Sequence, residues 1–217
     1  MKPDCHKYEG TVERVRALVT GSGEQRAAKD LRKYLKSYKG CLFDPKIDSS
    51  SDRISEADLD ALRSLSVRVT KDAKHQLLGG HDGERVAELF SRIPPDLDIW
   101  DVSGDEYENQ LGATSPAWQL WYVFRYLFRD APKRFGRGVT AGKLLHGKRP
   151  RLVPIYDSRV RSALGPRRRE FWVAIWCVMQ QADIRVALSR TQQQVPAAEH
   201  LSLLRVLDII AWMSEET

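Results

Sequence analysis

The amino-acid sequence predicts an all-α protein of 217 residues, folded as a single two-lobed helical domain. Apolar residues recur at intervals of three and four along most of the chain, which is the spacing of one face of a helix. Capping signals precede several of these runs, and no long segment alternates with the period of a strand. The length is sufficient to bury a substantial hydrophobic core.

The first half of the chain is expected to form helices separated by glycine and proline. They are expected at residues 7–19, 24–37, 56–65 and 83–92, with a short polar helix after Gly104. Gly21-Ser-Gly23 separates the helices 7–19 and 24–37, and Pro94-Pro95 ends the helix 83–92. Ser55-Glu-Ala-Asp58 resembles an N-terminal capping signal.

The second half is expected to continue in helices at 116–129, 158–164, 167–180, 183–193 and 199–213. Ser115-Pro116 is a favourable start, with serine as the cap and proline at the first helical position. Another helix is expected to open at Thr140-Ala141. Residues 38–54 are expected to form a long loop because they contain Gly40, Pro45 and a run of serines. Residues 66–70 alternate between polar and apolar side chains as in a strand, but five residues are too few to predict one.

The chain lacks an apolar run of the roughly 18–20 residues that cross a membrane, and its first residues do not resemble a signal peptide. Cys5, Cys41 and Cys177 are odd in number and widely spaced, so the sequence predicts no disulfide framework, no structural zinc and no iron–sulfur cluster. A cytoplasmic protein without a metal or organic cofactor is the resulting expectation.

Positive charge is concentrated in one segment. The whole chain carries +6, whereas residues 125–169 contain fourteen Lys and Arg against Asp130 and Asp157, a net charge of +12. A charged run is often only a solvated face, but so lopsided a segment attracts a polyanion. The expected partner is double-stranded DNA, because an anionic membrane would call for an amphipathic helix that the sequence does not contain.

Within this basic segment, Gly136 and Gly138 flank a turn that precedes Thr140-Ala141. Glycines in such a turn let backbone N–H groups approach a phosphate, and the following helix start adds the positive end of its dipole. Glycine turns between helices are also common as purely structural features. The predicted DNA contacts are Arg134, Gly136, Arg137, Gly138, Thr140, Lys143, Lys148, Arg149 and Arg159.

Residues 134–164 resemble the core of the helix-hairpin-helix (HhH-GPD) DNA glycosylases. The resemblance lies in Gly-Arg-Gly-Val-Thr-Ala and, seventeen positions after Thr140, in Pro154-Ile-Tyr-Asp157-Ser-Arg-Val. The turn itself diverges, since Lys133-Arg-Phe-Gly-Arg-Gly138 replaces the usual Leu-Pro-Gly-Val-Gly. The whole chain is also similar to an uncharacterised bacterial family with Thr-Ala-x-Lys-Leu-Leu and Lys-Arg-Pro-x-Leu-x-Pro.

The resemblance implies that Asp157 is the catalytic aspartate. Lyase members carry a lysine where this chain has Val139, so the resemblance implies base removal without backbone cleavage. It also allows a K⁺ or Na⁺ at the hairpin. A carboxylate near C1′ would stabilise the positive charge that develops as a base departs from its sugar. Alternatively, Asp157 at a helix start is simply an N-cap.

Base extrusion requires a pocket, for which Tyr156, Trp100, Trp118 and Trp121 are candidates. Trp118 and Trp121 share a helix face with Tyr122 and Arg125, although an aromatic stripe is more often part of a core. Two further polar residues are not expected to take part in catalysis. Asp208 is expected to pair with Arg205 at i, i+3, and His146 is expected to face phosphate or solvent.

The sequence therefore predicts a monomeric, monofunctional DNA glycosylase without an obligate protein partner, acting on a modified or damaged base in repair or in defence against phage. Two alternatives remain open. One is a DNA-binding module that kept the hairpin without catalysis, and the other is an RNA-binding protein using the same basic face.

Overall fold

The structure is a computed structural model that describes residues 2–130 and 136–216. Across these residues it consists of helices and connecting turns without a strand, which confirms the predicted all-α class. The strand-like residues 66–70 form a connection. Ser66 ends a 3₁₀ helix in the left-handed conformation (φ 61°), and Thr70 caps the next helix.

The helices follow one another with short connections. The N-terminal ones are η1 (Cys5–Tyr8), α1 (Glu9–Val19), α2 (Ser22–Ser37), η2 (Lys39–Leu42) and η3 (Asp44–Lys46). The central ones are α3 (Glu56–Ala61), η4 (Leu62–Leu65), α4 (Lys71–Gly79), α5 (His81–Ser91), α6 (Tyr107–Gln110) and α7 (Pro116–Leu127). The C-terminal ones are α8 (Arg137–Lys148), α9 (Ser158–Leu164), η6 (Arg168–Glu170), α10 (Phe171–Met179), α11 (Ala182–Gln193), η7 (Pro196–Ala198) and α12 (Leu203–Ser214).

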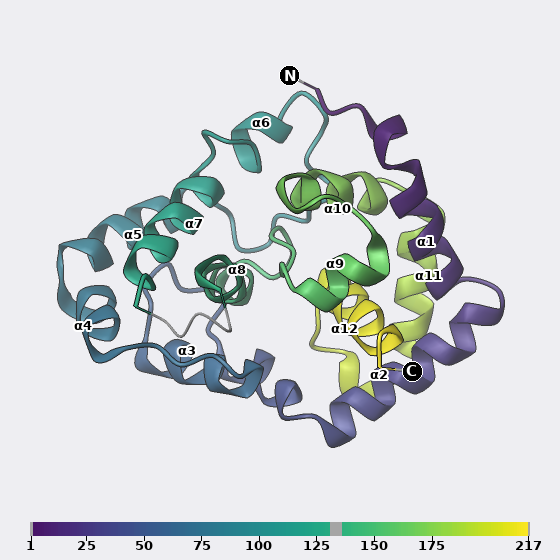
Figure 1. The fold of residues 1–217 in the computed structure, drawn as a ribbon, viewed down its shortest axis with the longest axis horizontal. Coiled ribbons are helices and arrows are strands. Elements are labelled where there is room, and N and C mark those ends of the chain that lie inside the picture. The colour runs from purple at the N-terminus through teal and green to yellow at the C-terminus, as the bar shows by residue number, and fades with distance from the viewer. Residues whose placement is uncertain (1, 131–135, 217) are drawn as a thin grey trace.

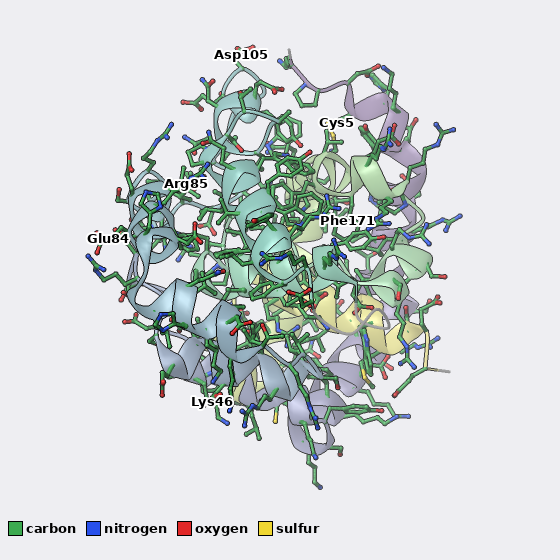
Figure 2. The ribbon with its side chains drawn as sticks, turned by 60° about the vertical axis from the view of Figure 1, so that its left-hand side comes forward. Cys5, Lys46, Glu84, Arg85, Asp105 and Phe171 are labelled. Carbon is green, nitrogen blue, oxygen red and sulfur yellow. A yellow bond between two sulfur atoms is a disulfide. The ribbon has the colours of Figure 1, made fainter. Side chains whose placement is uncertain are left out.

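The larger helices form two groups on either side of α8 (Figure 1). The first group contains α3, α4, α5 and α7, and the second contains α1, α2, α9, α10, α11 and α12. Helix α8 packs along α7 and also contacts α3 and η4. Buried apolar side chains from both groups form one continuous hydrophobic core. Phe171 points into this interior, whereas Lys46, Glu84, Arg85 and Asp105 point outward (Figure 2).

Local capping explains several helix starts. The Ser55 hydroxyl accepts a hydrogen bond from Asp58 N, and the Asp58 carboxylate accepts one from Ser55 N, which completes the expected capping box. The Ser115 hydroxyl accepts one from Trp118 N, with Pro116 at the first position of α7. Both predicted helix starts are confirmed.

The long connection 38–54 contains two short 3₁₀ helices and is held by the buried end of α8. The Lys148 ammonium donates to the carbonyls of Asp48 (2.6 Å) and Arg53 (2.9 Å) and lies 3.0 Å from the Asp58 carboxylate. The Arg149 guanidinium donates to the Ser49 carbonyl and pairs with Asp52. These two cations supply the donors that the turns of this loop would otherwise lack.

The prediction that Lys148 and Arg149 contact flanking phosphates is therefore wrong. Lys148 is fully buried and Arg149 is 1% exposed. Carboxylates and carbonyls of the 48–58 segment, together with the carbonyls of Phe90 and Ile93, already satisfy their charge and their donors. The count of basic residues in 125–169 thus overstates the positive surface.

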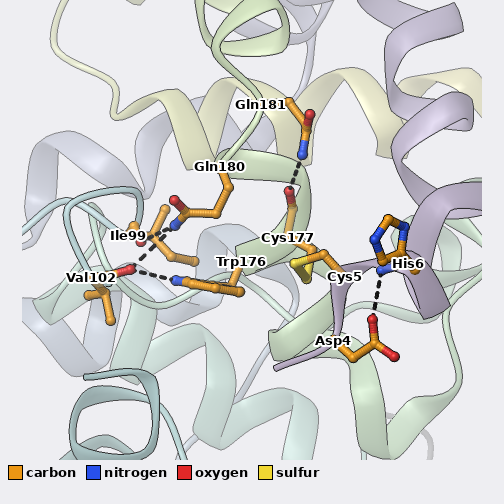
Figure 3. Close-up of a disulfide and its surroundings, with 9 residues drawn as sticks. All are labelled: Asp4, Cys5, His6, Ile99, Val102, Trp176, Cys177, Gln180 and Gln181. Atoms are coloured by element: carbon orange, nitrogen blue, oxygen red, sulfur yellow. Dashed lines mark hydrogen bonds between the residues drawn. A yellow bond between two sulfur atoms is a disulfide. The ribbon is translucent and has the colours of Figure 1, made fainter. Parts of the chain in front are cut away.

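A disulfide joins Cys5 of η1 to Cys177 of α10 across 172 residues, and Cys41 is free (Figure 3). This corrects the expectation that the cysteines stay unpaired. Their spacing indicated no framework, whereas packing of η1 against α10 brings the two sulfurs together. With a disulfide present, the cysteines no longer support a reducing compartment.

Replacing Cys177 with serine is expected to lower the free energy of unfolding. Closing a loop of this length removes up to about 5 kcal/mol of chain entropy from the unfolded state. Urea denaturation under non-reducing conditions measures the effect. Cys41→Ser is the matched control and should leave stability nearly unchanged; equal curves for the two variants would contradict a formed disulfide.

Candidate active site

Asp157 lies at the end of the extended segment that links α8 to α9. It is the N-cap of α9, with extended backbone angles, and its Oδ1 accepts a hydrogen bond of 2.9 Å from Arg159 N. The capping interpretation is thereby confirmed. The side chain is also 19% exposed and lines a pocket of about 560 Å³. Capping and contact with a ligand are compatible at this position.

This pocket, which we call the aspartate pocket, is lined by α8 and by residues on both sides of it. Its walls come from α2, the 38–40 turn, the end of η4, α8, the start of α9 and α12. The lining residues are Tyr34, Tyr38, Lys39, Gly40, Ser64, Leu65, Ser66, Lys143, Ile155, Asp157, Arg159, Arg205, Asp208 and Trp212. Chain segments far apart in the sequence therefore build one concave polar site.

Lys143 projects from α8 into the aspartate pocket. Its Nζ lies 3.7 Å from the Asp157 carboxylate and donates to the Leu65 carbonyl at 3.2 Å. Burial lowers the pKa of Lys143, although the charges of Asp157 and Asp208 oppose that shift. The predicted contact of Lys143 with a phosphate stays a prediction, since its ammonium lines this pocket beside Asp157.

Asp208 is a second carboxylate in the aspartate pocket. The expected pair with Arg205 at i, i+3 is confirmed, and Arg205 also pairs with Asp44 and donates to the Tyr34 hydroxyl. Asp208 is 8% exposed, and its Oδ1 has no hydrogen-bond partner within the described part of the chain. Burial raises the pKa of Asp208 to about 6; Arg205 opposes the shift and the Asp157 charge adds to it.

The pKa of Arg205, the partner of Asp208, is also shifted. Burial lowers its pKa, but the charges of Asp44, Tyr34 and Asp208 outweigh burial and raise it overall. One guanidinium is shared between two carboxylates, so it does not fully compensate the burial of Asp208.

The raised pKa of Asp208 makes stability pH-dependent. The folded state binds this proton more tightly than the unfolded state, so the stabilisation is complete below about pH 4. It is lost as pH rises through about 6, at a cost on the order of 3 kcal/mol. Urea denaturation between pH 4 and 7 should show this decline in the wild type and a flatter profile for Asp208→Asn.

Asp60 provides the control for that comparison. A hydrogen bond from Lys74 lowers the pKa of this exposed carboxyl, so its contribution to stability is lost as pH falls. That loss lies below the ordinary pKa of 3.8 and outside this window, so Asp60→Asn should keep the slope of the wild type between pH 4 and 7. Parallel profiles for the wild type and Asp208→Asn would show that Asp208 titrates normally.

Three aromatic rings form one wall of the aspartate pocket. Tyr34 and Tyr38 are stacked at 5.6 Å, and Trp212 meets Tyr38 edge-on at 5.5 Å. Arg159, an exposed residue predicted to bind DNA, lies over the Trp212 ring at 4.6 Å. Sequence reasoning missed this wall because Trp212 lies 174 positions after Tyr38, and no local pattern joins α2 to α12.

Three of the four predicted base-pocket residues meet in a second pocket, but not with Asp157. Trp118, Trp121 and Tyr156 line a cavity of about 580 Å³ beside the start of α8. Trp100 lies elsewhere, near the guanidinium of Arg185 at 5.9 Å. Tyr156 and Asp157 are neighbours in the chain, yet they line different pockets.

The glycine turn differs in detail from its prediction. Gly136 has φ 63° and is the N-cap of α8, so the helix opens at Arg137 and not at Thr140. Thr140 is buried in the first turns of α8, and its hydroxyl donates to the Gly136 carbonyl at 3.4 Å. The predicted phosphate contact of Thr140 is wrong for this reason.

Gly138 is also buried, and Trp121 Nε1 donates to its carbonyl at 3.2 Å. A Cβ at this position would lie 3.1 Å from the Trp121 ring, so close packing accounts for the glycine. The predicted phosphate contacts of Gly138 and Arg137 stay predictions: Gly138 is buried but lines the second pocket, and Arg137 is exposed. Arg134 lies outside the described residues, and the predicted K⁺ or Na⁺ at the hairpin stays a prediction.

The expectation that His146 faces phosphate or solvent is wrong. The ring is fully buried in α8, and Nδ1 lies 2.6 Å from the Val153 carbonyl. Burial lowers its pKa to about 4, so the ring is neutral at physiological pH. His146 packs α8 against the segment that leads to Asp157.

The described helices include none that is long and apolar enough to span a membrane. In comparisons with known proteins, neither the curated proteins nor the solved structures gave a match. A model of a protein family of unknown function, DUF6308, matches residues 27–215, a range that contains every lining residue of both pockets. The chain therefore belongs to the DUF6308 family.

Proposed function

We propose that this chain is a monofunctional DNA glycosylase with the two-lobed architecture of the helix-hairpin-helix glycosylases that its motifs resemble. Asp157 hydrolyses the N-glycosidic bond of a modified or damaged base that has been flipped out of the duplex. The observation that carries the proposal is the placement of the Asp157 carboxylate in an aromatic-walled pocket, 3.7 Å from the Lys143 ammonium.

The chemistry requires a negative charge beside the sugar. As the bond between C1′ and the base nitrogen breaks, the electron pair leaves with the base and positive charge develops on the sugar. The Asp157 carboxylate stabilises that charge and orients a water whose oxygen bonds to C1′. One proton of that water is released and the departing base is protonated, so the products are a free base and an abasic site.

The aspartate pocket suits an extruded base. Tyr38 and Trp212 offer ring faces and edges for stacking, and a volume of about 560 Å³ accommodates a nucleoside. Exposed Arg159, in the lining of this pocket, and exposed Arg137, at the start of α8, supply positive charge for the phosphates of double-stranded DNA. Affinity that declines steeply with added salt is the corresponding expectation.

The proposed lack of lyase activity depends on Val139, where lyases carry a lysine. Lys143 is one helical turn further along α8, and its amine already contacts Leu65 and Asp157. Borohydride reduction with DNA that contains a preformed abasic site tests this part alone. No covalent adduct is expected, and an adduct lost in Lys143→Gln would instead establish a Schiff base.

The direct test incubates the protein with duplexes that carry damaged or hypermodified bases, followed by alkali. Strand breaks that appear only after alkali are expected for at least one duplex, because abasic sites resist neutral buffer but not base. Asp157→Asn in parallel should produce none. Breaks without alkali would contradict a monofunctional enzyme.

A second candidate is a DNA-binding module without catalysis. It is favoured by the internal partners of Asp157, since one oxygen caps α9 and the other faces Lys143. In this case, Asp157→Asn changes no activity on any duplex. DNA binding alone does not distinguish the two candidates, whereas release of a base does.

A further inference from the structure

The second pocket, which we call the tryptophan pocket, lies on the opposite side of the Tyr156–Asp157 segment from the aspartate pocket. It is formed by α7, the start of α8, Tyr156 and residues 168–172. The lining residues are Trp118, Trp121, Tyr122, Arg125, Gly138, Tyr156, Arg168, Arg169, Phe171 and Trp172. Its volume is about 580 Å³, close to that of the aspartate pocket.

The rings of this pocket form a connected aromatic surface. Trp118 lies 4.7 Å from Trp172 and 4.9 Å from Trp121, measured between ring centroids. Tyr122 lies 5.9 Å from Trp118, and it is 57% exposed. If these aromatic residues only formed part of the core, Tyr122 would be buried. Its ring is instead open to solvent.

All the charged side chains that line the tryptophan pocket are positive. The lining residues include Arg125, Arg168 and Arg169 but no carboxylate. Among the described residues, no ion pair compensates any of these three arginines. Arg125 lies over Trp121 at 4.6 Å and Arg168 over Tyr156 at 5.8 Å. Stacking on a ring does not neutralise a guanidinium, so the pocket favours an anion.

A ligand for this site must therefore combine a flat aromatic part with a negative charge. Indole and phenol faces stack on any nucleobase, and arginines bind the phosphate attached to it. Three arginines and a lining without a carboxylate also disfavour a cationic ligand. A nucleotide meets both requirements with one molecule.

We infer that the tryptophan pocket binds a nucleotide, with its base stacked on the Trp118 and Tyr122 side and its phosphate held by Arg168 and Arg169. The nucleotide is either an unpaired one within a DNA strand or a free mononucleotide. The site is separate from Asp157 and does not require base excision. Failure of the proposed glycosylase activity therefore leaves this inference standing.

The test titrates the full-length protein with deoxyadenosine monophosphate, deoxyadenosine and a short single-stranded oligodeoxyadenylate, using quenching of tryptophan fluorescence. The monophosphate and the oligonucleotide are expected to bind, and the uncharged nucleoside at least about fivefold more weakly than the monophosphate. If the natural ligand is a nucleotide within a DNA strand, the oligonucleotide should bind more tightly than the monophosphate, with a steep salt dependence. If it is a free nucleotide, the monophosphate and the oligonucleotide should bind with equal affinity.

Variants inside the tryptophan pocket, compared with matched variants outside it, test whether the nucleotide binds there. Tyr122→Ala and Arg169→Gln are each expected to raise the Kd by about fivefold or more. Tyr126 and Arg129 form a similar ring and guanidinium pair at 4.6 Å outside the pocket, with Tyr126 66% exposed. Tyr126→Ala and Arg129→Gln should change the Kd by less than about twofold.

The absence of binding by the monophosphate and the oligonucleotide would overturn the inference. Equal loss in the pocket variants and in the Tyr126 and Arg129 controls would overturn it as well. Trp212→Phe and Asp157→Asn, both in the aspartate pocket, should retain the nucleotide affinity. Loss in those variants alone would assign the binding to the other pocket.

Discussion

Asp157→Asn is expected to lower the rate of base release by about a hundredfold or more while the protein remains folded. Removing a group that stabilises transition-state charge typically costs about two to three powers of ten in rate. Asparagine is as good an N-cap as aspartate, so the hydrogen bond from Arg159 N and the start of α9 are retained. The measurement is single-turnover excision on a duplex identified by the alkali assay.

The control for this prediction is a carboxylate at another helix start. Asp183 lies in the first turn of α11, is exposed and pairs with Arg16. Asp183→Asn should excise at the wild-type rate, and both variants should bind DNA within about twofold of the wild type. Full activity of Asp157→Asn would reduce the role of Asp157 to capping.

Lys148→Met is expected to lower the free energy of unfolding by about 3–5 kcal/mol. Both side chains of the Lys148–Asp58 pair are fully buried, so the variant leaves an uncompensated carboxylate in the core. The carbonyls of Asp48 and Arg53 lose their donor as well. A chain of this size should melt roughly 10 °C lower.

Urea denaturation with Arg53→Gln as the control tests this prediction. Arg53 pairs with Glu84 at 3.2 Å on the surface, where both side chains are mostly exposed. Such a pair contributes roughly 0–1 kcal/mol, so this variant should be close to the wild type. A Lys148→Met protein as stable as Arg53→Gln would contradict the buried ion pair.

Sequence patterns predicted helices well where a cap and an apolar stripe coincide. The start of α7 at Ser115-Pro116, the capping box at Ser55 and the bounds of α9 are examples. Helix α4 was not predicted, because its buried face consists only of Ala73 and Leu77 within a polar stretch. Its start depends on the Thr70 cap and its packing on α5.

The partners of charged side chains were harder to predict. The i, i+3 pair of Arg205 and Asp208 is local and therefore readable, but Asp44 reaches the same guanidinium from 161 residues away. Lys148 and Arg149 look like surface cations in a basic segment. Their partners lie about 100 positions upstream in the 48–58 segment, where no short-range pattern indicates them.

By itself, the sequence determined the helical class, most helix positions and the placement of Asp157 at a helix start, because hydrophobic periodicity and capping act over a few residues. Only the tertiary structure decided which residues share a site. It placed Asp157 with Tyr38, Asp208 and Trp212, placed Tyr156 with the tryptophans of α7, and paired Cys5 with Cys177. These contacts depend on how helices distant in the chain pack around one core, and that packing follows from the burial of all their apolar faces together.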